Sequence, residues 1–297
     1  MVRAIAPLIA WSGAGCTGEA RVVPPSEAAL IIDDFGDTLR PMTGDRPQRI
    51  VSLNPATTEL LFAIGAGARV VGRTTWDGWP DSAKLVPALG DALRPNVEAV
   101  LAVRPTLVLL YASEDNRAAA RTLRSAGIPT LTLRNDRIAD FVRTTMLIAR
   151  ATGDTARARI VVDTVQATLE RVRRATALGP RPTAFWKVWD RPLMTIGRGS
   201  FLSELVSIAG GINLYDDLAS PSPTVTLEDV AQRDPDVILV APGTGDALRR
   251  AVPWQAVRAV REGHLAVIDT ARVGRPGVRL GEAAVSLARI LRPGALP

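Results

Sequence analysis

Cysteine, histidine and aromatic residues are scarce in this chain of 297 residues, which has one cysteine, one histidine and 4% aromatic side chains. A single cysteine cannot form a disulfide within the chain, so the fold must rest on its hydrophobic core. Zinc and manganese sites need several histidine, aspartate or glutamate ligands around one ion. We interpret His264, which directly precedes a predicted strand, as a turn residue, and we predict no metal site.

The motifs of common nucleotide-dependent and hydrolytic enzymes are also missing. The sequence has no Gly-x-Gly-x-x-Gly fingerprint after its first strand, no Gly-Lys-Ser/Thr phosphate loop and no Gly-x-Ser-x-Gly nucleophile elbow. Four carboxylates near predicted strand ends are interpreted as loop caps and rim residues: Asp77, Asp91, Glu114 and Asp115. We therefore predict that the chain is not an enzyme. Two alternative hypotheses from other functional classes are kept, an enzyme and a soluble metabolite sensor.

The chain has fewer acidic than basic residues, 30 against 36, and a formal charge of +6. A basic balance is one mark of nucleic-acid binding, but here the arginines are scattered along predicted helix faces and form no block. No nucleic-acid motif accompanies them. We predict no nucleic-acid partner.

The first residues have the order of a secretory signal peptide. Residues 1–3 supply a positive start, residues 4–11 an apolar run, and residues 13–15 small side chains just before Cys16. We predict that residues 1–15 are a signal peptide and that its cleavage site resembles that of a bacterial lipoprotein, with the lipid on Cys16. An ordinary signal peptide and a disordered cytoplasmic tail are the alternatives.

Two segments about half a chain apart repeat one local design. Glu59 and Glu204 each stand in a short predicted helix, six residues before the glycine that ends it, Gly65 or Gly210. A second repeat follows in each half, where a glutamate precedes an Asp-Pro or Arg-Pro pair and then an apolar strand. Repeats in the same order predict two similar lobes with a cleft between them.

Apolar strands and helical stretches alternate in both halves. The strands are predicted at residues 49–53, 70–73, 107–111 and 129–133 and, after a long helix, at 183–188, 237–241 and 265–269. This alternation is typical of α/β lobes whose parallel sheets are covered on both faces. Between the halves, residues 154–177 lack proline and glycine and have apolar residues at helical spacing, which predicts a helix of about 35 Å.

We therefore predict an α/β fold of two Rossmann-like lobes with mainly parallel sheets, joined by one long backbone helix. The predicted boundaries are a tether at 16–48 with a short strand or hairpin around Ile31, an N-terminal lobe at 49–153, a linking helix at 154–178 and a C-terminal lobe at 179–297. Because a packed helix resists bending, we expect small lobe movements on binding.

Four stretches resemble the helical-backbone substrate-binding proteins of bacterial ABC importers: Arg49 to Glu59, Asn96 to Leu109, Gly197 to Leu205 and Arg275 to Leu280. Together and in this order they are specific for that group, which serves cobalamin, ferric siderophores, haem and some metal ions. The resemblance implies a monomeric receptor, periplasmic or at the cell surface, with a membrane permease and its ATPase subunit as partners.

The resemblance also implies how this receptor docks. In the group, a surface glutamate on each lobe pairs with arginines of the permease, and the matching positions are Glu59 and Glu204. Two separated charged contacts are suited to setting the orientation and the rate of encounter, while adding modest affinity.

The aromatic residues near strand ends are the candidates for ligand binding. They are Trp76, Trp79, Tyr111, Trp186 and Trp189. Open α/β sheets bind ligands at strand ends, and flat side chains there can cover the faces of a corrin or a porphyrin. For Trp186, core packing is the alternative. Similarity to the cobalamin-binding members implies ligand contact at Trp76, Tyr111 and Trp189.

We predict that the transported ligand is cobalamin or a related corrinoid and that the chain has no cofactor of its own. A ferric siderophore or haem is the alternative ligand. An anionic ferric complex needs cations, and the candidates for that role are Arg73, Arg94, Arg198 and Arg275.

Overall fold

The computed structural model describes residues 30–42 and 48–296. The predicted signal peptide, Cys16 and most of the predicted tether lie outside these ranges. No helix within the two ranges is long and apolar enough to cross a membrane. The described part of the tether contains an antiparallel pair of two-residue strands, β1 (Ile31–Ile32) and β2 (Thr38–Leu39), which is the predicted hairpin around Ile31.

The N-terminal lobe contains a parallel sheet with the strand order β4-β3-β5-β6. Its strands are β3 (Ile50–Leu53), β4 (Val70–Gly72), β5 (Leu107–Tyr111) and β6 (Thr130–Leu133). Its helices are α1 (Pro55–Ala63), α2 (Val97–Ala102) and α3 (Glu114–Ser125), with 3-10 turns at Gly67–Arg69 and Asp81–Leu85. Along β5, Leu109 belongs to one apolar cluster and Val108 and Leu110 to another. Both faces of the sheet are therefore buried, as its continuous apolar strands predict.

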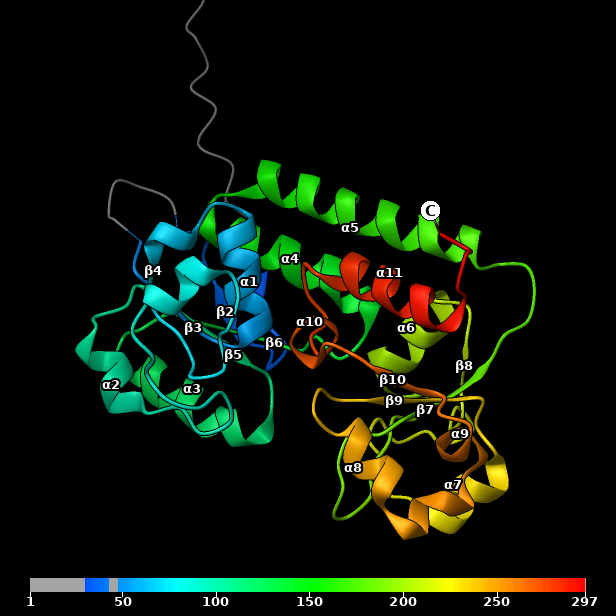
Figure 1. The fold of residues 1–297 in the computed structure, drawn as a ribbon. Coiled ribbons are helices and arrows are strands. Elements are labelled where there is room, and N and C mark those ends of the chain that lie inside the picture. Colours follow the sequence, from blue (N-terminus) through cyan, green and yellow to red (C-terminus); the bar gives the residue numbers. More distant parts are fainter. Residues whose placement is uncertain (1–29, 43–47, 297) are drawn as a thin grey trace, which may run out of the picture.

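The C-terminal lobe contains a second parallel sheet, with the order β10-β9-β7-β8. Its strands are β7 (Thr183–Trp186), β8 (Ile212–Asn213), β9 (Val237–Val240) and β10 (Leu265–Val267). Its helices are α6 (Phe201–Ile208), α7 (Leu227–Arg233), α8 (Gly245–Arg250), α9 (Arg258–Arg261), α10 (Thr270–Val273) and α11 (Leu280–Leu291), with a 3-10 turn at Val252–Ala256. The prediction of two α/β lobes with parallel sheets is confirmed (Figure 1).

The two sheets have the same topology. When the second order is written in reverse, β8-β7-β9-β10 matches β4-β3-β5-β6 strand for strand. The first helix of one lobe, α1, is thus the equivalent of α6, and α4 (Ile138–Thr152), which follows β6, is the equivalent of α11, the last helix after β10. The local repeat around Glu59 and Glu204 therefore reflects a repeat of whole lobes.

The same local chemistry starts and ends α1 and α6. The side chain of Asn54 accepts a hydrogen bond from the Ala56 amide at 2.9 Å, and that of Ser200 accepts one from the Leu202 amide at 3.2 Å. Such caps satisfy amides that have no partner within the helix. After each helix a glycine takes a positive φ, 82° at position 65 and 83° at position 210, which glycine adopts without a Cβ clash. Both glutamates therefore stand at the same place in their helices.

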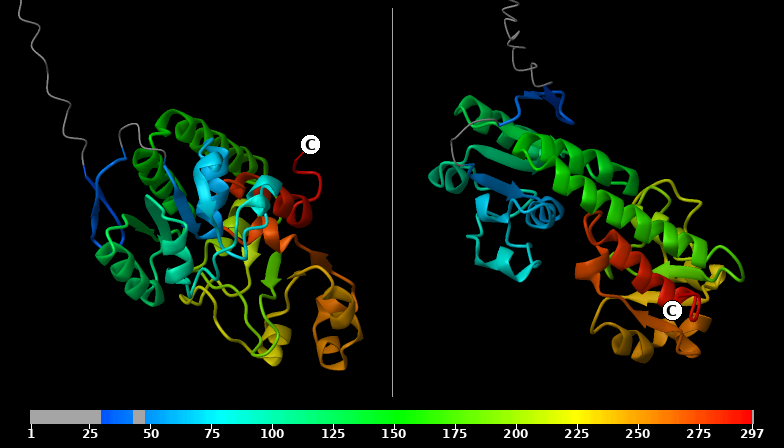
Figure 2. Two further views of the ribbon diagram at one scale, coloured as in Figure 1. Left: turned by 90° about the vertical axis from the view of Figure 1, so that its left-hand side faces the viewer. Right: turned by 90° about the horizontal axis from the view of Figure 1, so that it is seen from above.

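Two helices connect the lobes. The predicted linking helix is α5 (Thr155–Ala175), and α4 packs beside it (Figure 2). Phe141 of α4 and Val165 of α5 belong to the core cluster of the C-terminal lobe. Ile148 of α4 and Ala158 of α5 belong to a core cluster of the N-terminal lobe. The connection is thus stiffer than the single helix that the sequence predicts, because both helices contribute side chains to both cores.

Candidate functional site

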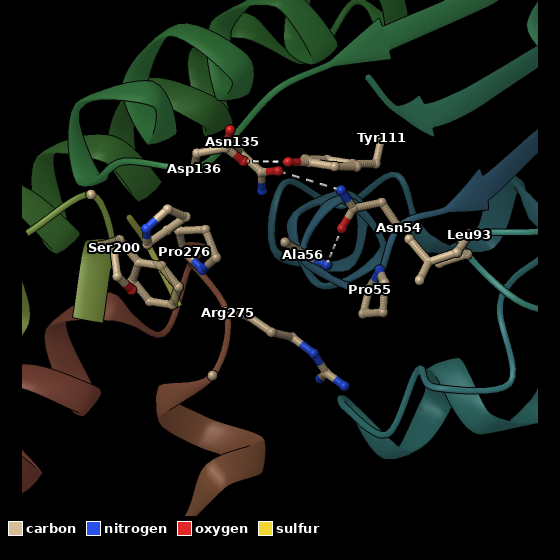
Figure 3. Close-up of a pocket in the computed structure, with 15 residues that line it drawn as sticks. Asn54, Pro55, Ala56, Leu93, Tyr111, Asn135, Asp136, Ser200, Arg275 and Pro276 are labelled. Atoms are coloured by element: carbon tan, nitrogen blue, oxygen red, sulfur yellow. Dashed lines mark hydrogen bonds between the residues drawn. The ribbon is translucent and has the colours of Figure 1, made fainter. Parts of the chain in front are cut away.

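A cavity of about 490 Å³ lies between the lobes where four connecting segments meet (Figure 3). Residues 54–56 and 135–136 come from the N-terminal lobe, and residues 199–201 and 274–276 from the C-terminal lobe. The first three segments lie where the carboxyl end of a strand leads into the following helix, and residues 274–276 connect α10 to α11. Strand-to-helix connections are the places at which parallel sheets bind ligands. The cavity is in the size range of small-molecule sites.

The wall of the cavity combines apolar surface with a few polar groups. The apolar part includes Pro55, Leu93, Phe201 and Pro276. On the polar side, the Asn54 side-chain amide donates to Asn135 Oδ1 at 3.4 Å. The Tyr111 hydroxyl donates to Asp136 Oδ1 at 2.5 Å, and Figure 3 shows the side chains of Tyr111 and Asp136 pointing toward one another. Burial, followed by the bond to Asp136, raises the pKa of Tyr111 to about 12. Both effects favour the neutral phenol over the tyrosinate.

The charged groups of the wall are already bonded. Among the described residues that line the cavity, Arg275 is the one cation and Asp136 the one acid. Arg275 donates to Glu59 Oε1 at 2.8 Å and to the backbone oxygen of Trp76 at 2.6 Å. Because Arg275 belongs to the C-terminal lobe and its two acceptors to the N-terminal lobe, both bonds cross the cleft. The cavity has no excess charge of either sign.

Glu59 is buried, which differs from the surface position that the resemblance implies. Its side chain is 2% exposed and bonded to Arg275. Burial raises its pKa above the ordinary 4.5, although the bond to Arg275 and the charges of Arg275 and Arg279 act to lower it. The neighbouring Asp77 is also buried, and burial raises its pKa as well. A surface position was the wrong expectation because the C-terminal lobe covers this side of α1.

Glu204 occupies the equivalent place and also faces an arginine. Arg137, directly before α4, forms an ion pair with Glu204, and it donates to the backbone oxygen of Arg198 at 3.0 Å. The contact between Arg137 Nε and Glu204 Oε1 is a charge contact without hydrogen-bond geometry. The Glu204 side chain keeps 27% of its surface exposed. Each of the two glutamates thus has an arginine as its partner.

The predicted ligand-binding tryptophans fall into three situations. Trp76 and Trp189 are 63% and 61% exposed, and their indole nitrogens donate to Asp91 Oδ2 at 3.0 Å and to the Arg191 backbone oxygen at 3.2 Å. They lie in loops beyond the carboxyl ends of β4 and β7, and neither is part of the cavity wall. Trp79 is half-buried, with the Arg279 guanidinium 5.3 Å from its ring centre.

Trp186 is a core residue and does not reach the cavity. It is 3% exposed and belongs to the apolar cluster that also contains Leu205 and Leu239. The reason is its position at the end of β7, a strand whose last three residues are all buried. Trp186 is therefore withdrawn from the ligand-binding set, in favour of the core alternative.

Several wall residues were not expected from the sequence, among them Asn54, Leu93, Asn135, Asp136 and Phe201. Their signal is topological: each follows a strand of a parallel sheet in a connection that faces the other lobe. The described residues contain no group of three or more histidine, cysteine, aspartate or glutamate side chains that could hold a metal ion.

Comparison with known proteins gives a consistent family. A family model described as periplasmic binding protein matches residues 50–271. The chain is 29% identical over 255 residues to the uncharacterised ABC transporter substrate-binding lipoprotein YvrC of Bacillus subtilis, covering 83% of this chain and 81% of YvrC. It is 27% identical over 219 residues to a vitamin B12-binding protein of Yersinia pestis, covering 74% of this chain and 76% of that protein.

Among solved structures, the apo form of the periplasmic haem-binding protein RhuT from Roseiflexus sp. RS-1 superposes with a TM-score of 0.76. The two sequences are 25% identical, and the match covers 84% of this chain and 100% of that one. The shared fold extends over both lobes.

Proposed function

This chain belongs to the periplasmic binding protein family, and on that basis we propose that it captures cobalamin or a related corrinoid and delivers it to the permease of an ABC importer. Members of the family bind and hand over a substrate and are not enzymes. The permease and a separate ATPase subunit are the implied partners. The choice of ligand rests on the cavity and its surroundings.

The observation that carries the corrinoid proposal is a charge-balanced, largely apolar cavity with an exposed indole beyond a strand end on each lobe. Arg275 and Asp136 are both bonded within the protein, so the wall offers no unpaired charge. A corrinoid is nearly neutral and is held by shape and apolar contact more than by charge. It is also larger than the cavity, and the part that protrudes would meet Trp76 and Trp189, whose indoles are held in place by hydrogen bonds.

The alternative ligands need groups that this site supplies less well. An anionic ferric siderophore requires free cations, and Arg275 is committed to Glu59. Ferric haem can be held by a tyrosinate, and Tyr111 lines the cavity. Its raised pKa, about 12, disfavours the tyrosinate that such a bond uses. The haem-binding name of the Roseiflexus structure keeps haem as the second candidate.

Docking and anchoring complete the proposal. Glu204, whose side chain is 27% exposed, is proposed to contact the permease. Glu59 is withdrawn from that role, because its side chain is 2% exposed and bonded to Arg275. Cys16 is proposed to carry a lipid that tethers the receptor to the membrane, a proposal supported by the lipoprotein name of YvrC. If so, the Cys16→Ala variant moves from the membrane fraction to the soluble fraction; an unchanged distribution would exclude the anchor.

Titration calorimetry of the protein without residues 1–16 tests the ligand. Cyanocobalamin, haem and a panel of ferric siderophores are titrated separately. One-to-one binding of cyanocobalamin, weakened by Trp76→Ala or Trp189→Ala, is the expected result. Heat from haem or a ferric complex alone would replace the corrinoid by that ligand, and no heat from any of them would overturn the receptor proposal.

A further inference from the structure

We propose that Asp136 makes the cavity selective for ligands whose periphery carries amides and against ligands whose periphery carries carboxylates. This inference rests on the corrinoid function proposed above and names the groups of the ligand that the site distinguishes. Its basis is a polar patch on the N-terminal lobe, which consists of Asn54, Tyr111, Asn135 and Asp136 (Figure 3). Within this patch the hydrogen bonds of the protein occupy donors and leave acceptors.

The hydroxyl of Tyr111 is available to a ligand mainly as an acceptor. It has one proton, which it donates to Asp136. Burial and this bond raise the pKa of Tyr111 to about 12, so both favour the phenol that keeps the proton. What remains at the oxygen is its acceptor capacity. A ligand group that bonds to this hydroxyl must therefore bring a donor of its own.

The two asparagines of the patch offer little to a ligand. The Asn54 oxygen accepts from the Ala56 amide at 2.9 Å, and the Asn54 side-chain amide donates to Asn135 Oδ1 at 3.4 Å. Both asparagines are buried. The polar surface that the patch presents is therefore mainly the Tyr111 oxygen and the Asp136 carboxylate.

The two charges of the cavity wall sum to zero, but a ligand does not meet them equally. The Arg275 side chain is 22% exposed, and its guanidinium is paired with Glu59 at 2.8 Å. The Asp136 side chain is 45% exposed, and its bonded partner Tyr111 is uncharged. Arg134 Nε lies 3.8 Å from Asp136 Oδ2, and an ion pair that is this long and this exposed cancels little charge. The acid is thus the more accessible charge of the wall.

Amides and carboxylates interact differently with this patch. A primary amide supplies N–H donors to the Tyr111 oxygen and to Asp136, and a hydrogen bond to a charged acceptor is stronger than one between neutral groups. An ionised carboxylate has no donor and places a like charge beside Asp136. The side chains of a corrin are amides, whereas haem carries two propionates. The patch therefore favours a corrinoid over haem where the side chains of the ring meet the N-terminal lobe.

The test compares two corrinoids that differ in these groups. Dicyanocobinamide carries amides on its corrin side chains, and dicyanocobyrinic acid carries carboxylic acids in their place. Both are titrated calorimetrically into the full chain, and the measured quantity is the Kd of the acid divided by the Kd of the amide. We expect this ratio to exceed one in the parent. It should fall about three- to fivefold in Asp136→Asn, which keeps the shape and an acceptor oxygen but removes the charge.

Asp163→Asn is the matched control, because it removes the same charge from an exposed position on α5 that is not part of the cavity wall. It should leave the ratio unchanged. Tyr111→Phe should keep most of the ratio, since the charge of Asp136 remains. The effect of Asp136→Asn should shrink at high salt, because the charge of a half-exposed carboxylate is screened. An altered wall shape would give a change that does not depend on salt.

The outcomes separate this inference from the proposed function. An unchanged ratio in Asp136→Asn, an equal fall in Asp163→Asn, or a change that salt does not affect would overturn the inference. Cobyrinic acid that fails to bind even Asp136→Asn would also overturn it, because the exclusion would then lie elsewhere. If the parent binds neither cobinamide nor cyanocobalamin, the corrinoid function is refuted, and the selectivity proposed for it fails as well.

Discussion

The Trp76→Ala substitution tests whether an exposed indole at the strand end contributes to ligand binding. Trp76 is 63% exposed, and its indole nitrogen is anchored to Asp91 Oδ2 at 3.0 Å. The ring is therefore held in one place with much of its surface free. A ligand that covers it gains apolar contact at a low cost in side-chain order.

The expected loss can be worked out from this surface. An aromatic side chain offers about 200 Å² for burial, of which 63% is free here, and a flat ligand covers about half of the free part. At about 25 cal/mol per Å², the resulting 60 Å² or so contributes about 1.5 kcal/mol. We therefore expect the Kd for cyanocobalamin to rise about tenfold in Trp76→Ala.

The assay is titration calorimetry, with thermal unfolding as a check on folding. Leu178→Ala is the matched control, because Leu178 is also highly exposed but lies at the end of the linking helix, away from the cavity. It should bind as the parent does. Trp186 differs from Trp76 because it lies in the core. Trp186→Ala should therefore lower the free energy of unfolding by about 3–5 kcal/mol. A Kd for Trp76→Ala within twofold of the parent value, at an unchanged Tm, would refute the assignment.

The remaining predictions concern two titratable residues, Glu59 and Tyr111. Burial raises the pKa of Glu59 above 4.5, so the folded state holds this proton more tightly than the unfolded state, and stability falls as the pH rises through the raised pKa. Glu59→Gln lacks this loss, so chemical denaturation should find the variant at least as stable as the parent at neutral pH. The difference between their free energies of unfolding should disappear below about pH 4.5. A difference that does not change with pH would contradict the argument. The Tyr111 pKa of about 12 predicts no tyrosinate absorbance from this residue at pH 10, the ordinary tyrosine pKa. Tyr111→Phe should cost about 1 kcal/mol of stability for the lost bond to Asp136; full stability would show that bond to be unimportant.

Most of the fold follows from local patterns in the sequence. The strand predicted at residues 107–111 is β5 with the same bounds, and those predicted at 49–53 and 129–133 differ from β3 and β6 by one residue. All three are short, buried and bounded by polar or proline residues, and their residues are mostly apolar in β3 and β5 and alternate threonine with leucine in β6. By contrast β8, two residues long after a glycine pair, was not predicted, because so short a strand has no period.

The site was predicted less completely, because its contacts join residues far apart in the chain. Arg275 and Glu59 are 216 positions apart, and no periodicity relates them. The burial of Glu59 did have a local signal: residues 56–61 of α1 are all buried, and Glu59 is the one charged residue in that helix. A helix without a polar face indicates burial all round. The place of Trp76 beyond a strand end was easier to predict, because strand ends can be located from the sequence.

The two connecting helices limit how far the lobes can move. Since α4 and α5 contribute to the cores of both lobes, a wide hinge motion would pull side chains such as Phe141 or Ile148 away from the core of one lobe, which is costly. Only small rotations are compatible with this arrangement. A small rotation is nevertheless enough to break the contacts of Arg275, because hydrogen bonds and close ion pairs weaken within about an ångström of added distance. The stiffness of the connection thus concentrates the change at the cleft, where the ion pair of Arg275 and the cavity lie side by side.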